Sequence, residues 1–258
     1  MFFFNKKSSI ILSLLLSMGL VIPEKAGASN FRVSPITVSL SSRVSSKVLT
    51  VHNDSNETLR FQLHTYAWKQ NAKGEMQLDA TQDVVAFPGL FALKPGQNRI
   101  VRVGTLTPVS SIEKTYRIFI EELPPEAKPN QQQNVVRILT KLGIPIFLQP
   151  TKQVVEGGVE NIVVSKNQIN FQVTNRGNVH FIAQKLRIKG IDESDKSVFD
   201  RQRNGWYVLA DSSQSYDLKM SQQECSKTRT LVIEVKTTDN KMFTEKREMP
   251  KDACSASN

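Results

Sequence analysis

The sequence predicts an all-β protein made of two β-sandwich domains that follow an export signal. Three observations support this prediction. Apolar and polar residues alternate along many short segments, turn-forming residues separate these segments, and 258 residues suffice for two domains of ordinary size. Period-two alternation places one strand face on a core and the other in solvent, and turns at this spacing favour antiparallel sandwiches. No segment with helical periodicity exceeds two turns.

The first 28 residues have the pattern of a secretory signal peptide. Lys6 and Lys7 form a basic start, residues 10–22 are mostly apolar, and Ala26-Gly27-Ala28 supplies small residues for cleavage. The apolar run is shorter than the roughly 20 residues that span a bilayer. We therefore expect cleavage after Ala28 and a mature protein without membrane insertion.

Residues 29–150 form the predicted N-terminal domain. Its expected strands have apolar residues at alternate positions: Ile36, Val38 and Leu40; Leu59, Phe61 and Leu63; Tyr116, Ile118 and Ile120; a further expected strand covers 48–51. Proline cannot continue a central strand, so the segment Gln149-Pro150-Thr151 is the expected boundary.

Residues 151–258 form the predicted C-terminal domain. Its expected strands are Ile169–Val173, Ala183–Ile188, Trp206–Leu209 and Leu231–Val235. A short pattern, V-x-N-x-x-N, occurs at 51–56 and again at 173–178, in each case where the second strand of its half ends. Asparagine tolerates turn geometry and bonds its own backbone, so the repeat supports two similar halves.

Two cysteines, Cys225 and Cys254, lie in the last third of the chain. An even pair in an exported protein predicts a disulfide. The histidines His52, His64 and His180 are scattered and no C-x-x-C is present, so we expect no metal site.

The chain carries a formal charge of +10. A basic protein suggests nucleic acid, acidic partners or an anionic membrane face, while an ordinary solvated surface remains equally open. Export argues against nucleic acid, and the charges form no polybasic block. No nucleophile elbow, zinc-protease motif, P-loop or dinucleotide fingerprint is present, so we expect neither an enzyme nor a cofactor.

Several segments together resemble the periplasmic chaperones of the chaperone–usher pathway, which assemble pili. They are Tyr116–Pro125 (YRIFIEELPP), Phe87–Phe91 (FPGLF), Leu93–Gln97 (LKPGQ), Ile144–Phe147 (IPIF) and Val173–His180 (VTNRGNVH). The resemblance covers most of the mature chain and is nearest to the archaic branch, which serves secreted spore-coat-like pili.

This resemblance implies two immunoglobulin-like β-sandwich domains arranged with a cleft between them. It implies a periplasmic protein whose partners are pilin (fimbrial) subunits and an outer-membrane usher. A family member lends an incomplete subunit a strand and then delivers it to the usher.

Residues 131–148 are the predicted donor strand. Val136, Ile138, Leu142 and Ile144 are expected to share an apolar face that fills a groove in the subunit. The alternative is an ordinary last core strand of the first domain. The preceding polar segment, 124–133, is expected to be a flexible loop.

Arg117 is the first candidate anchor for a subunit's terminal carboxylate. Pairing the two strands around the 124–133 loop is expected to place Arg117 opposite residues 140–142 and thus beside Lys141, the second candidate; Arg102 is the third. The better-known family pattern has an arginine in the first strand, but residues 35–39 (PITVS) contain none. The alternative role for each cation is a surface or inter-strand ion pair.

Two other functions compete with the chaperone. A secreted structural or adhesive β-sandwich surface protein would share the export signal and the fold class, but a pilin should be one incomplete domain. A periplasmic hydrolase has no supporting motif in the sequence.

Overall fold

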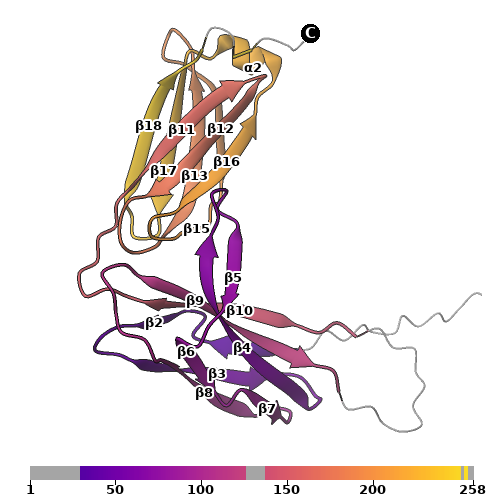
Figure 1. The fold of residues 1–258 in the computed structure, drawn as a ribbon. Coiled ribbons are helices and arrows are strands. Elements are labelled where there is room, and N and C mark those ends of the chain that lie inside the picture. The colour runs from indigo at the N-terminus through magenta and orange to yellow at the C-terminus, as the bar shows by residue number, and fades with distance from the viewer. Residues whose placement is uncertain (1–29, 126–136, 251–252, 255–258) are drawn as a thin grey trace, which may run out of the picture.

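The fold is all-β, with two immunoglobulin-like sandwiches set at an angle to each other (Figure 1). The computed structural model describes residues 30–125, 137–250 and 253–254. The predicted signal peptide, residues 1–28, lies outside them. Within the described residues no helix is long and apolar enough to cross a membrane.

Two sheets make up the first sandwich. One has the order β1-β3-β8-β6, and the other has the order β2-β10-β9-β4-β5 with β7 also paired to β4. The strands of the first sheet are β1 (Phe31–Ser34), β3 (Ser46–Asn53), β8 (Asn98–Thr105) and β6 (Val84–Phe87). Those of the second are β2 (Val38–Leu40), β10 (Lys141–Leu148), β9 (Lys114–Leu123), β4 (Leu59–Gln70), β5 (Met76–Ala80) and β7 (Leu90–Leu93).

The alternating residues predicted for this half supply its core. Val38, Leu40, Phe61, Tyr116, Ile118 and Ile120 are all buried in one cluster. Ile36 is the exception, because β2 begins only at Val38 and Ile36 remains 71% exposed in the connection from β1. The predicted strand therefore begins two residues too early.

Two further sheets make up the second sandwich, with orders β11-β12-β16 and β14-β13-β17-β18, and β15 also pairs with β13. Its elements are β11 (Gly157–Ser165), β12 (Gln168–Asn175), β13 (Phe181–Ile191), β14 (Ser197–Arg203), β15 (Tyr207–Val208), β16 (Ser213–Lys219), α2 (Gln222–Lys227), β17 (Thr230–Thr237) and β18 (Met242–Glu248). A separate apolar core fills it.

The repeated asparagine pattern has the same structural role in both halves. Asn53 is fully buried, and its amide donates to the carbonyls of Glu57 and Leu93 while its oxygen accepts from the Ser55 N–H. Asn175 is 1% exposed and makes the matching bonds to Val179, Val208 and Gly177. Each asparagine thus satisfies backbone groups where a strand ends inside the protein.

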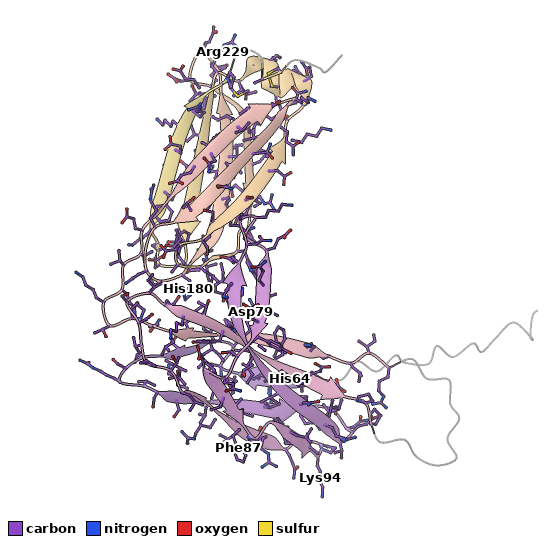
Figure 2. The ribbon with its side chains drawn as sticks, viewed as in Figure 1. His64, Asp79, Phe87, Lys94, His180 and Arg229 are labelled. Atoms are coloured by element: carbon purple, nitrogen blue, oxygen red, sulfur yellow. A yellow bond between two sulfur atoms is a disulfide. The ribbon has the colours of Figure 1, made fainter. Side chains whose placement is uncertain are left out.

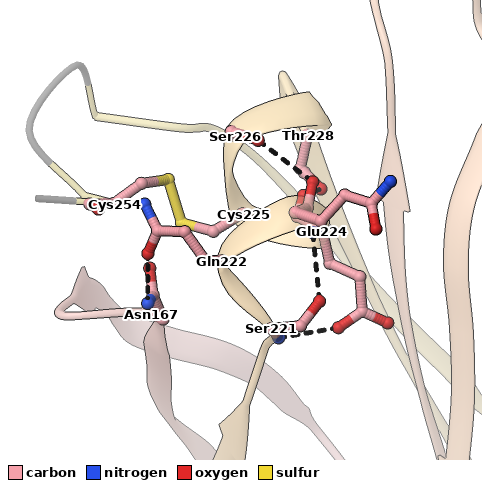
Figure 3. The surroundings of a disulfide bond; sticks show 9 residues. Asn167, Ser221, Gln222, Glu224, Cys225, Ser226, Thr228 and Cys254 are labelled. Carbon is pink, nitrogen blue, oxygen red and sulfur yellow. Dashed lines mark hydrogen bonds between the residues drawn. A yellow bond between two sulfur atoms is a disulfide. The ribbon is translucent and has the colours of Figure 1, made fainter.

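The predicted disulfide between Cys225 and Cys254 is present (Figure 3). It joins the short helix α2 to the C-terminal segment. Ser221 caps this helix by accepting from the Glu224 N–H, and the Glu224 carboxylate accepts from the Ser221 N–H in return. The Gln222 side chain also donates to the Cys254 carbonyl at 2.8 Å, so a hydrogen bond joins the same two segments as the disulfide.

The junction between the two sandwiches is a third buried cluster. Trp68 and Phe147 from the first sandwich pack with Leu209 and Tyr207 from the second. Beside it, the buried Glu113 carboxylate accepts from both the backbone N–H and the ring Nδ1 of His180, at 2.9 and 2.6 Å. Figure 2 places His180 at this junction. The two domains therefore have a defined contact, and two hollows near it are lined by residues of both sandwiches.

Candidate functional site

The strongest candidate for a binding group is Arg117 in β9. Tyr116, Ile118 and Ile120 of this strand point into the core, so Arg117 and Phe119 lie on the opposite face of the sheet. That face carries the aromatic residues of the junction. Arg117 is only 8% exposed, and its guanidinium carbon lies 4.2 Å from the centre of the Trp68 ring.

The charge of Arg117 has no protein counter-ion in the described part of the chain. Burial lowers the pKa of its guanidinium, and the nearby Tyr207 opposes that shift. Its buried Nε also has no hydrogen-bond partner among the described residues. A buried cation without a carboxylate is costly, so an anion from outside the chain would be bound favourably here.

Neighbouring residues give this cation a defined place. Trp68, which is 1% exposed, stacks beneath the guanidinium and contacts Tyr207 of the second sandwich edge-on, with ring centres 5.3 Å apart. A Cβ at Gly143 would lie 2.8 Å from the Phe119 ring and 3.4 Å from Arg117 Nη1. Gly143 therefore leaves room for the Phe119 ring, and Arg117 lies at ordinary contact distance beside it.

The second candidate, Lys141, does not lie beside Arg117, so the predicted pairing register was wrong. Lys141 pairs with Glu121, whereas Arg117 pairs with Pro145. The connection between the two strands runs from 124 to 140, so its midpoint falls later than a 124–133 loop implies. The Lys141 ammonium forms an ion pair with Glu121 at 3.0 Å, which is the alternative role considered for it.

The third candidate, Arg102, lies in β8 of the other sheet, where its neighbours are Val48 and Phe87. It is exposed and donates to the Ser46 hydroxyl. Arg102 and Arg117 lie on the outer faces of the two sheets, and these faces point in opposite directions. Arg102 therefore does not share a surface with Arg117. Of the three cations, only Arg117 faces the junction.

The predicted donor strand has an open edge. The strand β2 covers only Ile146–Leu148 of β10, so the first half of β10 has β9 as its only partner among the described strands. The residues just before it, Arg137–Thr140, are not in a strand. Ile138 and Leu139 expose 57% and 41% of their surface there.

The four residues predicted to form the donor face do not share one exposed surface. Ile144 is 1% exposed and belongs to the domain's own core, and Leu142 is partly buried against that core. Both lie opposite core residues of β9, namely Ile118 and Ile120, and the sandwich needs them there. Of the three that the structure describes, only Ile138 is exposed. Val136, like most of the 124–133 loop, lies outside the described residues.

Two contributors to the site were not foreseen from the sequence. Trp68 follows Leu59, Phe61 and Leu63 in the alternating pattern of β4 but at the opposite parity, so an aromatic on the polar face was a usable signal. Gly143 interrupts an apolar strand, which often marks a close approach of another group.

Comparisons with known proteins agree on one family. Residues 30–153 match the family model described as pili and flagellar-assembly chaperone, PapD N-terminal domain. The chain is 26% identical over 132 residues to a probable fimbrial chaperone, LpfB, of Escherichia coli O157:H7. That alignment covers 50% of this chain and 51% of LpfB, so the chain spans about half the length of the curated relative it matches.

Solved structures share the whole two-domain fold. One chain in the structure of the chaperone–tip adhesin complex CsuC–CsuE, from archaic pili of Acinetobacter baumannii, aligns with a TM-score of 0.58 at 16% identity. The alignment covers 84% of this chain and 98% of that chain. The complex of the SafB chaperone with the SafA pilin of Salmonella enterica aligns with a TM-score of 0.54 at 14% identity, covering 85% and 97%. These likenesses establish the fold.

Proposed function

We propose that the chain, whose residues 30–153 match the model of the pili and flagellar-assembly chaperones, is a periplasmic chaperone of pilus subunits. It acts by binding, and it is not an enzyme. In this proposal the chain binds a subunit in the cleft, lends it a strand, and delivers it to an outer-membrane usher. The domain division is the predicted one, 29–150 and 151–258, behind a cleaved signal peptide at 1–28.

The observation that carries the proposal is the buried, unpaired charge of Arg117. A subunit's C-terminal carboxylate is the anion that fits it, because arginine offers a planar fork that meets a carboxylate with two parallel hydrogen bonds. Charge-assisted bonds of this kind contribute about 1.5–3 kcal/mol each when they are shielded from water. A terminus bound at Arg117 would also set the register of the neighbouring strands.

The open edge of β10 supports the second part of the proposal. An edge strand presents unpaired N–H and C=O groups, and an incoming chain can pair with them. The exposed Ile138 and Leu139 lie directly before this edge, so their side chains are available to an incomplete sandwich. Of the predicted donor residues, Ile138 is therefore the one proposed to contact the subunit, together with Val136 two positions before it in the sequence.

Co-purification from the periplasm tests this function. Tagged wild-type protein, the Arg117→Ala variant and the Arg102→Ala variant are purified, and the proteins that accompany them are identified by mass spectrometry. Arg102→Ala is the matched control, because it removes an exposed arginine from the sheet that faces away from the site.

We expect a β-rich subunit with an incomplete fold to accompany the wild type and the control in equal amounts. The amount of subunit recovered with the Arg117→Ala variant should be at least tenfold lower, which corresponds to a loss of about 1.4 kcal/mol of binding free energy. Its melting temperature should stay close to that of the wild type. Equal recovery with Arg117→Ala would remove the anchor, and surface export of the chain itself would favour a structural or adhesive protein.

A further inference from the structure

The β4–β5 hairpin extends beyond the sheet to which it belongs. The strand β4 pairs with β9 only as far as Ala67, whereas its last residues pair with β5 alone. All five residues of β5 are exposed. A two-stranded hairpin without a core is marginally stable by itself, so other contacts must hold this one in place.

Those contacts come from the second sandwich, toward which the hairpin points (Figure 1). The Lys73 carbonyl at its tip accepts from the Ser215 N–H at 3.4 Å and from the Gln214 side chain at 3.3 Å. Gly74 has a positive φ of 82°, and a Cβ there would collide with Gln214. The tip is therefore hydrogen-bonded to β16.

Gln70 makes the most specific of these contacts. Its amide nitrogen donates to the Tyr207 carbonyl at 2.8 Å, and its oxygen accepts from the Leu209 N–H at 2.8 Å. One side-chain amide thus bonds two backbone groups of the other domain, as the neighbouring strand of a sheet would. Its nitrogen also lies 3.2 Å from the Gly74 carbonyl, which fixes its orientation.

Gln70 lies two residues after Trp68, the residue on which the Arg117 guanidinium stacks. Trp68 and Gln70 are on the same face of β4, because side chains alternate along a strand. The Trp68 ring packs against Tyr207 and Leu209, the two residues whose backbones Gln70 bonds. Arg117 in turn stacks on Trp68.

We propose that the β4–β5 hairpin is a strut between the domains and that Gln70 is a positioning residue for Arg117. Gln70 fixes Tyr207 and Leu209 against Trp68, and Trp68 then holds the guanidinium at the orientation that meets a carboxylate. This inference rests on the proposed function, because it assigns Gln70 a role in the same site. It predicts that Gln70 affects recognition of a terminal carboxylate and not merely stability.

The test uses a peptide of the last 15 residues of the subunit that co-purifies with the wild type, made once as the free acid and once as the C-terminal amide. Affinities for both are measured by calorimetry with the wild type, Gln70→Ala, Gln70→Glu and Lys69→Ala. Lys69 is the matched control, because it pairs with Asp79 within the hairpin and contacts nothing in the second domain among its described interactions. Melting temperatures of all four proteins are recorded in parallel.

We expect the wild type and Lys69→Ala to share the same preference for the acid over the amide. Gln70→Ala should lower that preference by about tenfold, which corresponds to about 1.4 kcal/mol. Gln70→Glu keeps the acceptor for Leu209 but loses the donor for Tyr207, so it should fall near Gln70→Ala. A ligand-free readout accompanies this: in a Trp206→Phe background, the remaining Trp68 should become more accessible to acrylamide in Gln70→Ala.

The outcomes separate this inference from the proposed function. A wild type that binds acid and amide equally contradicts the carboxylate anchor itself. A wild type that prefers the acid, together with a Gln70→Ala variant of undiminished preference, overturns the role of Gln70 alone. Equal weakening of acid and amide binding by Gln70→Ala would also overturn it, since the loss would then be general.

Discussion

Replacing Ile138 and Ile144 by alanine separates a partner-binding side chain from a core side chain. The two isoleucines lie six residues apart in one predicted strand, yet Ile138 is 57% exposed and Ile144 is 1% exposed. Complete burial of such a side chain contributes about 1.5–3 kcal/mol. Scaled by the exposed fraction of Ile138, the gain in a subunit complex is about 1–2 kcal/mol, a 5- to 30-fold change in affinity.

Ile144→Ala should instead cost about 2–5 kcal/mol of the protein's own stability, because it leaves a cavity in the first core. That loss corresponds to a fall of about 5–20 °C in melting temperature. The assay is the melt of each purified variant and the yield of its complex with the co-purified subunit. A large fall in the melt for Ile138→Ala, or a normal complex yield with a normal melt, would refute the assignment of Ile138 to the partner surface.

Three further changes test other parts of the molecule. Cys225→Ser opens the disulfide, whose cysteines are 29 residues apart, and should cost about 3.5 kcal/mol by loop-closure entropy; an unchanged denaturation midpoint would contradict this. Asn175→Ala leaves the buried carbonyls of Val179 and Val208 unpaired and should cost about 2–3 kcal/mol in urea denaturation, whereas a loss below 0.5 kcal/mol, roughly a surface substitution, would argue against its structural role. Gly143→Val crowds the Phe119 ring beside Arg117 and should reduce the yield of subunit complex several-fold; a yield equal to that of the wild type would show that this space is not needed.

The fold class could be predicted because period-two alternation states directly which side of a strand is buried. Tyr116, Ile118 and Ile120 were identified as core residues in this way, and they are 2% exposed or less. The paired asparagines Asn53 and Asn175 were likewise visible as a repeat, because the same backbone problem recurs in both halves. Their bonds to distant carbonyls, such as that of Leu93, needed the three-dimensional structure.

The site was only partly predictable, because it depends on pairing register and on contacts between domains. Arg117 stood out as a cation within an apolar run, but the register that separates it from Lys141 depends on where the strands resume after the connection. Ile144 and Ile138 have the same parity, yet only one is buried, since burial depends on where the opposing sheet ends. The contact between Trp68 and Tyr207 joins residues 139 positions apart, and no local pattern encodes it.

Site-specific photo-cross-linking in the periplasm tests the central claim most directly. A photoreactive amino acid is placed at Ile138, and a second protein carries it at Phe87, which is 77% exposed on the opposite sheet. We expect a cross-link from position 138 to a pilus subunit, a weaker or absent one from position 87, and loss of the first when Arg117 is also replaced by alanine. Cross-linking of the subunit at position 87 but not at position 138 would contradict capture along the open edge of β10.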